Sequence, residues 1–513
     1  MPRRSLLLLL VSAACGSPQL FGLEWSWPAG EVMATPMVAD LDADGAPEVV
    51  VVIGRLDDPD SLEVGALVAL DGAGGGERWR VDAHGRATPA IGDVDGDARP
   101  DVVHASRPGD DHLSTVHAVD ADGKQLWIAR TAAGGPAKIR VDNGAFALAN
   151  LDDDPGAEVA IGGVLIDHDG LVVWQSPDAG GEGSPHLTGD PAVLLYPGGL
   201  ATFADLTDDG RPELITGRRA WSIAWTPGAP PSVSVSLLWA DDSGPGSDGY
   251  PAVADLDLDG GPEVVLSAWP EIHVLAGATG EPWCSAAGCA PPIVIPGGNL
   301  GGPATIADFD GDGRPELAFS FGLTLAVYDV HRDGEEVVVP DGDPTPAPGA
   351  VYRRWSLPIQ DLSSASNGVM AFDLDGDGAA DIAHQDECHL RVLDGRTGAV
   401  IRELESTSLT IHEYPVVADV DADGRAELLV AANRGDVNTV RACATAAGLA
   451  EYPTRQGLFV YGDGAWPGAP VPWTSHTHHL SNVDARGNAP ADEPPAWHDR
   501  NSFREQRPEP PPG

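Results

Sequence analysis

Eight short segments of the chain repeat one pattern of oxygen-bearing side chains. In the first copy, Asp40-Leu-Asp42-Ala-Asp44-Gly45-Ala-Pro-Glu48, acids stand at positions 1, 3, 5 and 9 and glycine stands at position 6. The other copies begin at residues 93, 150, 205, 255, 308, 373 and 419, at spacings of 46 to 65 residues. One such match would carry little weight, whereas eight at a nearly regular period indicate a repeat architecture.

The spacing of these side chains suits a hard cation. A sharp turn at position 6 brings the acids around one point, and oxygen ligands in this number favour Ca²⁺ over a transition metal. A cation also removes the mutual repulsion of four neighbouring carboxylates. The predicted metal ligands are Asp40, Asp42, Asp44, Glu48, Asp93, Asp95, Asp97, Asp101, Asn150, Asp152, Asp154, Glu158, Asp205, Thr207, Asp209, Glu213, Asp255, Asp257, Asp259, Glu263, Asp308, Asp310, Asp312, Glu316, Asp373, Asp375, Asp377, Asp381, Asp419, Asp421, Asp423 and Glu427.

An EF-hand and a plain acidic turn both fit these loops less well. An EF-hand needs a Glu at position 12 and flanking helices, whereas here the last acid stands at position 9 and β-branched residues follow. Plain acidic turns would also contain Asp-Gly, but they do not account for the fixed ligand spacing. Two loops depart from the pattern, through Asn150 and Pro155 in one and Thr207 in the other. We expect these two loops to bind calcium more weakly than the others. In the loop that begins at 93, Ala98 replaces the glycine at position 6, and we expect this change to affect calcium affinity less because every acid is kept.

The residues around each loop predict strands. A short apolar segment precedes the loop and a β-branched run such as 49–52 follows it. A hairpin with an Asp-Gly or Thr-Gly turn comes next and often reaches a Trp, as in 67–79. Four strands per repeat are typical of a β-propeller blade. A linear solenoid is the alternative, but a closed ring hides the sheet edges. We therefore expect an all-β propeller with eight blades, seven remaining possible.

The loops and hairpins resemble the FG-GAP or VCBS-type repeats of integrin-α-like propellers, over residues 32–475. The resemblance implies that an Asp-x-Asp-x-Asp-Gly-x-x-Asp loop binds Ca²⁺ between the first two strands of each blade. Rings of that family usually have seven blades, whereas this chain has eight loops, each followed by a hairpin-like segment. The segment 23–27 ends in Trp like the outer hairpin strands, and we expect it to complete the last blade and close the ring.

The chain is strongly acidic and begins with an export signal. Asp and Glu number 78 against 30 Lys and Arg, a formal net charge of −48, which argues against binding nucleic acid through phosphates. Arg3 and Arg4 precede a short apolar stretch, and Ser12-Ala-Ala-Cys15 resembles a bacterial lipobox, so residues 1–15 are expected to form the leader. Cys15 is then the lipidation site; simple cleavage nearby, with Cys15 incidental, is the alternative.

Four further cysteines lie in the exported part of the chain, where disulfides are favoured over free thiols. Cys284 and Cys289 bracket a short turn and are expected to pair, which leaves Cys388 with Cys443. Free buried thiols remain the alternative.

The C-terminal extension, residues 476–513, breaks the repeat. His476, His478 and His479 could suggest zinc, but no third fixed ligand is evident, and we expect the extension to pack against the ring. The Pro-rich end 508–513 is expected to be disordered.

No nucleophile motif or phosphate loop appears, so we expect a non-catalytic, monomeric binding or adhesion module at the cell envelope. Its partner would be a glycan or a surface protein, and any membrane contact would be made through a lipid anchor. A calcium-dependent polysaccharide lyase and a structural envelope protein are the alternatives, and a quinoprotein dehydrogenase is a more distant one. The candidate recognition inserts are 180–197, 333–350 and 434–456.

Overall fold

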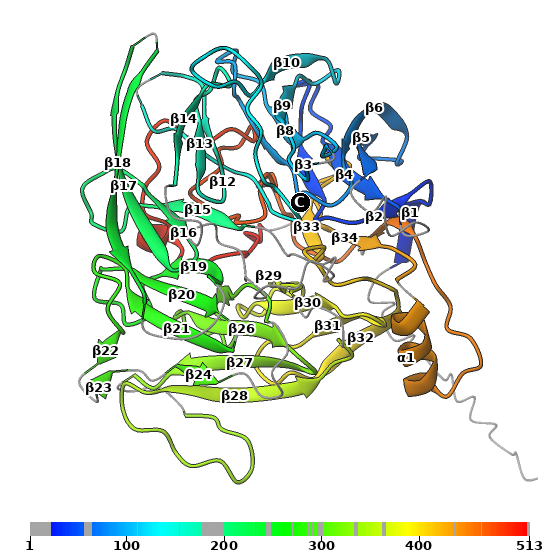
Figure 1. Ribbon diagram of the computed structural model, residues 1–513. Helices are drawn as coiled ribbons and strands as arrows, with labels where there is room; N and C mark the ends of the chain where they lie inside the picture. The colour runs from blue at the N-terminus through cyan, green and yellow to red at the C-terminus, as the bar shows by residue number, and fades with distance from the viewer. Residues whose placement is uncertain are drawn as a thin grey trace, which may run out of the picture.

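Eight antiparallel sheets stand around a common centre in the computed structural model and form an eight-bladed β-propeller (Figure 1). The predicted fold class is therefore confirmed, with eight blades rather than seven. The structure describes residues 22–509 except for 56–63, 110, 153, 177–198, 229, 243–247, 269, 286–287, 290–291, 295–300, 333–336, 362–365, 436 and 463. Within these residues, no helix is long and apolar enough to span a membrane.

Most blades are built from consecutive strands. The first strand of a blade lies nearest the centre, where it contacts the first strands of neighbouring blades. The first blade is β3 (Met37–Ala39), β4 (Glu48–Gly54), β5 (Val64–Asp71) and β6 (Glu77–His84), and the second is β7 (Ala90–Gly92), β8 (Asp101–Ala105), β9 (Val116–Val119) and β10 (Gln125–Ile128). The third blade is β11 (Ala147–Ala149), β12 (Glu158–Ile161), β13 (Val164–Ile166) and β14 (Val172–Gln175). The fourth is β15 (Ala201–Ala204), β16 (Glu213–Thr216), β17 (Arg219–Thr226) and β18 (Ser232–Ala240). A short strand, β2 (Glu31–Val32), also pairs with β4.

The remaining blades follow the same order. The fifth blade is β19 (Tyr250–Ala254), β20 (Glu263–Ala268), β21 (Glu271–Ala276) and β24 (Ile293–Val294), and the sixth is β25 (Thr305–Ala307), β26 (Glu316–Phe321), β27 (Thr324–Val330) and β28 (Val351–Pro358). The seventh blade is β29 (Met370–Phe372), β30 (Asp381–Gln385), β31 (His389–Leu393) and β32 (Val400–Glu405). The eighth is β33 (Val416–Ala418), β34 (Glu427–Ala432), β35 (Gly457–Gly462) and β1 (Gly22–Trp27).

Burial along the strands explains their composition. The second strands are buried on both faces because they lie between neighbouring blades, and they read as continuous apolar runs such as 49–53. The outer strand β18 instead alternates between exposed and partly buried residues over most of its length, as expected for a strand with one face in water.

The ring is closed by the N-terminal strand. β1 pairs antiparallel with β35, so the last blade combines residues from both ends of the propeller sequence. Trp25 of β1 then packs on Gly75 in the β5–β6 turn of the first blade. The segment 23–27, which was expected to complete the last blade, lies within β1 and makes this pairing.

Tryptophans fasten one blade to the next. Trp239 of β18 lies on Gly280 of the following blade, where a Cβ would be 2.5 Å from the indole, and its Nε1 donates to Gly277 O at 2.6 Å. Trp355 makes the same pair of contacts with Gly398 and with Gly395 O at 2.8 Å. The turn glycines have positive φ, +69° at both positions, so glycine serves the turn and the close approach at once.

The C-terminal extension passes through the centre of the ring (Figure 1). The backbone of the extension, together with residues 473–475 just before it, pairs with the innermost strands at Val38–Trp473 and Ile306–Phe503, and Gln506 N donates to Ala371 O at 3.0 Å. Further hydrogen bonds join it to other innermost strands, through Ile91 N to Thr474 O at 2.8 Å, Thr477 Oγ1 to Ala201 O at 3.3 Å and Gln506 Nε2 to Val417 O at 3.0 Å. One extended segment thus connects blades that are far apart in sequence. Glu509 pairs with Gly468. The rest of the end expected to be disordered, residues 510–513, lies outside the described part.

The insert 434–456 contains a helix that was not predicted from the sequence, α1 (Val437–Ala447). Figure 1 shows α1 at the outer edge of the ring. A disulfide between Cys443 and Cys388, with Cα atoms 5.5 Å apart, joins the helix to the seventh blade. Cys284 is also disulfide-bonded, and its backbone pairs with that of Cys289 in the hairpin of β22 (Cys284–Ser285) and β23 (Gly288–Cys289). A last short helix, α2 (Ala496–Asp499), lies in the C-terminal extension.

We expect Trp239→Ala to lower the free energy of unfolding by about 3–5 kcal/mol, because the substitution empties the contact between two blades and removes its hydrogen bond. Chemical denaturation measures this value. Leu237→Ala in the same strand is the control, since Leu237 is 48% exposed. Equal effects of the two substitutions would contradict the interblade role of the tryptophan.

Candidate metal centres

The acidic loops occupy the same place in all eight blades. Each one leaves the end of the innermost strand and leads into the second strand, whose first residue is the acid at position 9. That acid, called the closing acid below, lies at the junction of loop and sheet. It is one of Glu48, Asp101, Glu158, Glu213, Glu263, Glu316, Asp381 and Glu427, and all eight are buried.

Every closing acid accepts a hydrogen bond from the backbone N–H at position 2 of its own loop. In the first loop Leu41 N donates to Glu48 Oε2 at 2.9 Å, and the corresponding distances in the other seven loops are 2.7 to 3.1 Å. One carboxylate oxygen therefore fixes the loop, and the other can meet a further partner, which for Glu48 is Arg78.

The first acid of seven loops holds the turn in the same way. Asp40 Oδ2 accepts the N–H of Gly45 at 2.9 Å, and its Oδ1 accepts that of Asp44 at 3.1 Å. In the loops that begin at 93, 205, 255, 308, 373 and 419, the bond to position 6 recurs at 2.7 to 2.9 Å. The loop at 150 differs, since Pro155 has no N–H to donate.

These seven loops also share left-handed backbone at positions 4 and 6. Glycine is used at several of these places, but Leu258 has φ +61° and Ala98 has φ +68°. For a residue with a Cβ this conformation costs about 1 kcal/mol or more. Because Leu258 adopts this unfavourable conformation, the surrounding side chains must hold the loop in its shape.

The oxygens of each loop crowd together. Ligand atoms of Asp40, Asp42 and Glu48 lie within 4.8 Å of one another, and so do those of Asp93, Asp95 and Asp101 and those of Asp255, Asp257 and Asp259. Burial, the largest cause, and neighbouring carboxylates raise the pKa of Asp101 to about 8, of Glu263 to about 8 and of Glu427 to about 9. The closing acids are thus placed where negative charge is unfavourable, and a bound cation would stabilise it. The donor sets are all oxygen in these loops and fit a hard cation.

Arginines reach three of the loops, a feature that was not predicted from the sequence. Arg78 pairs with both Asp42 and Glu48, Arg354 lies 2.8 Å from Asp310, and Arg396 pairs with Asp377. Two of them form an Arg-Trp dipeptide with the tryptophan of the hairpin, at 78–79 and 354–355. That repeated dipeptide is a signal the sequence did contain.

The other predicted site residues lie as follows. Thr207 leaves the loop at 205 without a carboxylate at position 3, although Glu213 closes that loop as in the others. Cys15 lies outside the described residues. His476 and His478 are fully buried in the centre of the ring, and burial lowers the pKa of His478 to about 3 and that of His476 well below its usual value, so both rings are neutral at pH 7.

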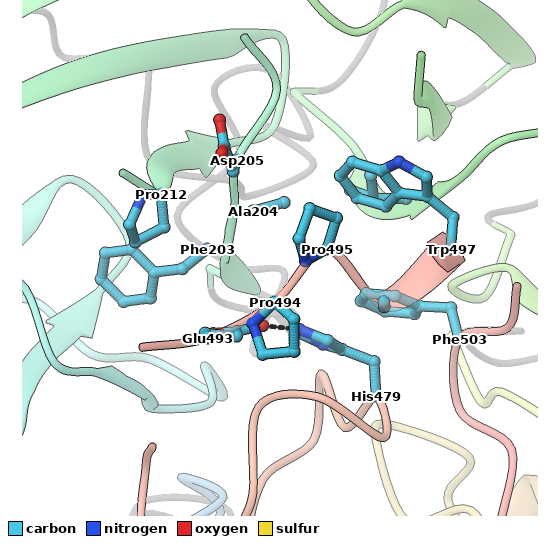
Figure 2. Close-up of a pocket in the computed structure, with 12 residues that line it drawn as sticks. Phe203, Ala204, Asp205, Pro212, His479, Glu493, Pro494, Pro495, Trp497 and Phe503 are labelled. Atoms are coloured by element: carbon cyan, nitrogen blue, oxygen red, sulfur yellow. Dashed lines mark hydrogen bonds and ion pairs between the residues drawn. The ribbon is translucent and has the colours of Figure 1, made fainter. Parts of the chain in front are cut away.

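The three histidines have different partners. His478 stacks on Trp473 with ring centroids 4.0 Å apart, and His476 meets the ring of Tyr414 edge-on at 4.8 Å. His479 Nε2 lies 2.6 Å from Glu493 Oε1 (Figure 2). This pair holds the extension where it covers Phe203 and the start of the loop at 205.

A hollow of about 160 Å³ opens beside the loops at 150 and 205. Its lining includes Asn150, Asp152, Arg211, Trp225 and Asp492. The N–H of the Trp225 indole has no hydrogen-bond partner among the described residues. The hollow combines an aromatic face with charged and amide groups, and Asp492 comes from the C-terminal extension. Of the predicted recognition inserts, 180–197 lies outside the described residues.

The fold has known counterparts. The biofilm matrix protein Bap1 of V. cholerae superposes with a TM-score of 0.64 at 19% identity, over 96% of this chain and 100% of that chain. The rhamnogalacturonan lyase YesW superposes with a TM-score of 0.53 at 15% identity, over 96% of this chain and 84% of that one. At such identities the likeness shows the fold alone. No protein-family model and no curated protein sequence matches the chain.

We expect Glu427→Gln to have different consequences with and without divalent cations. With a cation present the substitution removes a charged ligand and lowers the melting temperature by several degrees. In chelator the raised pKa of Glu427, about 9, leaves this side chain neutral near pH 7, so the amide changes the melting temperature little. Thermal unfolding followed by circular dichroism measures both cases. Glu405→Gln, at an exposed position of β32, is the control, and a cation-independent effect of Glu427→Gln would contradict a metal site.

Proposed function

We propose that this protein is an exported, calcium-stabilised binding module of the cell envelope that holds a glycan without chemically altering it. The hollow beside the loops at 150 and 205 carries the proposal. Trp225 offers an aromatic surface for the apolar face of a sugar ring, and Arg211 and Asp492 offer hydrogen bonds to its hydroxyl groups. Its volume of about 160 Å³ suits a group the size of one sugar ring.

Calcium is the cation we assign to the loops. The donors are carboxylate oxygens in a flexible loop, which match the coordination that Ca²⁺ prefers and Mg²⁺ does not. The loops join the first two strands of the blades, so binding would stabilise the ring from its inner edge. The role of calcium in this proposal is to hold the blades and the hollow in shape.

The proteins of similar fold support the assignment as a binding module and also suggest the main alternative function. Bap1 is a biofilm matrix protein, which agrees with a binding role outside the cell. YesW is a rhamnogalacturonan lyase, so a polysaccharide lyase is the second candidate. The two are distinguished by turnover, because a lyase releases new unsaturated sugar ends and a binding module does not.

The calcium assignment predicts how the loop at 205 can be improved. Thr207→Asp restores the missing carboxylate at position 3 and should raise the calcium affinity of that loop about tenfold, since affinity follows ligand charge. Competition with a chelating dye would show the weakest step of the binding curve moving to lower calcium. Thr131→Asp, on an exposed turn, is the control. An unchanged curve for Thr207→Asp would contradict calcium binding there.

The glycan assignment predicts a loss of binding in Trp225→Ala. On a glycan array in calcium, we expect the native chain to bind and the variant to bind at least tenfold more weakly, because the stacking surface is gone. Val400→Ala, at an exposed position of β32 in another blade, should bind like the native chain. Chelator should weaken binding by the native chain. Release of unsaturated products would favour the lyase, and equal binding by Trp225→Ala would contradict this site.

A further inference from the structure

The loop at 150 cannot adopt the shape of the other seven. Pro155 stands at position 6, where the other loops have left-handed backbone and an N–H that donates to the first acid. Proline has a fixed negative φ and no N–H. Asn150 replaces the first aspartate, and its Nδ2 donates to Asp154 O at 2.7 Å. This loop has therefore lost part of the arrangement that defines the calcium loops.

A histidine enters the same loop from the neighbouring hairpin. His168 lies in the turn between β13 and β14, where Gly72, Ala121 and Gly395 stand in other blades. Its Nδ1 lies 3.2 Å from Asp154 Oδ2, 3.2 Å from Asp167 Oδ1 and 3.9 Å from Glu158 Oε1. Gly156 makes room for it, since a Cβ at that position would be 2.7 Å from His168 Cβ.

Three atoms around this point have no hydrogen-bond partner in the described part of the chain. They are Glu158 Oε1, His168 Nδ1 and Asn150 Oδ1. Glu158 is completely buried, and its other oxygen already accepts the N–H of Leu151 at 2.7 Å. A buried carboxylate oxygen left without a donor is costly. It faces an imidazole nitrogen that Asp154 also approaches, and this grouping of ligand atoms points to an ion shared by all three.

We propose that the loop at 150 is a zinc-class site, in which His168 Nδ1, Asp154 and Glu158 hold a divalent transition metal ion. Calcium takes oxygen ligands, whereas an imidazole nitrogen beside carboxylates suits Zn²⁺ and its neighbours. Ligand atoms about 2.0–2.1 Å from a tetrahedral zinc ion lie about 3.3 Å apart. The observed 3.2 Å between His168 Nδ1 and Asp154 Oδ2 matches that separation. Asn150 Oδ1 or water would complete the set.

The test uses the full chain saturated with millimolar Ca²⁺ and exposed to Zn²⁺. Equilibrium dialysis with elemental analysis should find one zinc ion per chain that calcium does not displace. His168→Gln should reduce zinc affinity at least tenfold while calcium binding at the other loops is unchanged. His389→Gln is the matched control, because His389 also lies beside a carboxylate, 3.7 Å from Asp386 Oδ1. Cobalt gives a second readout, since visible absorption bands of a nitrogen-containing tetrahedral site should appear in the native chain and weaken in His168→Gln.

Two results would overturn the inference: calcium that displaces the zinc, or zinc binding that is unchanged in His168→Gln. Circular dichroism would check that His168→Gln is folded. Asp154→Asn is an independent variant of the same site, with the same expected loss of zinc. The experiments test the zinc proposal and the glycan proposal independently. A chain that binds glycan through Trp225 and takes no zinc refutes only the metal class, and the reverse outcome refutes only the glycan assignment.

Discussion

The fold places a buried carboxylate at the start of the second strand in all eight blades. The loop before that strand must stabilise this carboxylate. The backbone N–H at position 2 satisfies one oxygen of this closing acid. Burial and the neighbouring acids of the loop raise the pKa of the closing acid, as for Glu263 and Glu427, so negative charge is unfavourable there. A cation bound at a loop would offset that repulsion and link the first and second strands of the blade. On this account, stability and cation binding are coupled.

Two further devices hold the blades to one another. Tryptophans of the outer strands pack on turn glycines of the next blade, and β1 extends this contact across the closure of the ring. At the centre, the C-terminal extension binds innermost strands of blades on opposite sides of the ring. The extension also supplies Asp492 to the hollow beside the loops at 150 and 205. The lining of the candidate binding site thus includes a residue of the C-terminal extension.

Repetition made much of this structure predictable. The eight copies of the loop, the β-branched runs and the Asp-Gly turns fix the number and order of strands, because each copy supports the assignment of the others. The strand at 23–27 could be assigned from its likeness to the other Trp-bearing strands. Residues outside the repeat could not be placed in this way. Helix α1 lies in an insert with no counterpart, and the path of the extension depends on contacts with many blades.

The contacts that distinguish one loop from another were also hidden. His168 reaches Asp154 from a hairpin turn, and Arg78 reaches Asp42 across more than thirty residues of sequence. Such pairs follow from how two turns of one blade face each other, and the spacing of ligands within a loop does not reveal them. The loop at 150 looked like a weakened calcium site from its sequence, whereas the structure adds a nitrogen donor.

A count of the bound calcium ions is the decisive measurement. Native mass spectrometry of the full chain, freed of metal and then returned to millimolar calcium, gives the number of calcium ions per molecule. We predict seven, one in each loop that begins with an aspartate, with the loop at 150 left for a transition metal. A chain that retains its folded charge-state distribution while binding no calcium would contradict the link between cation binding and stability.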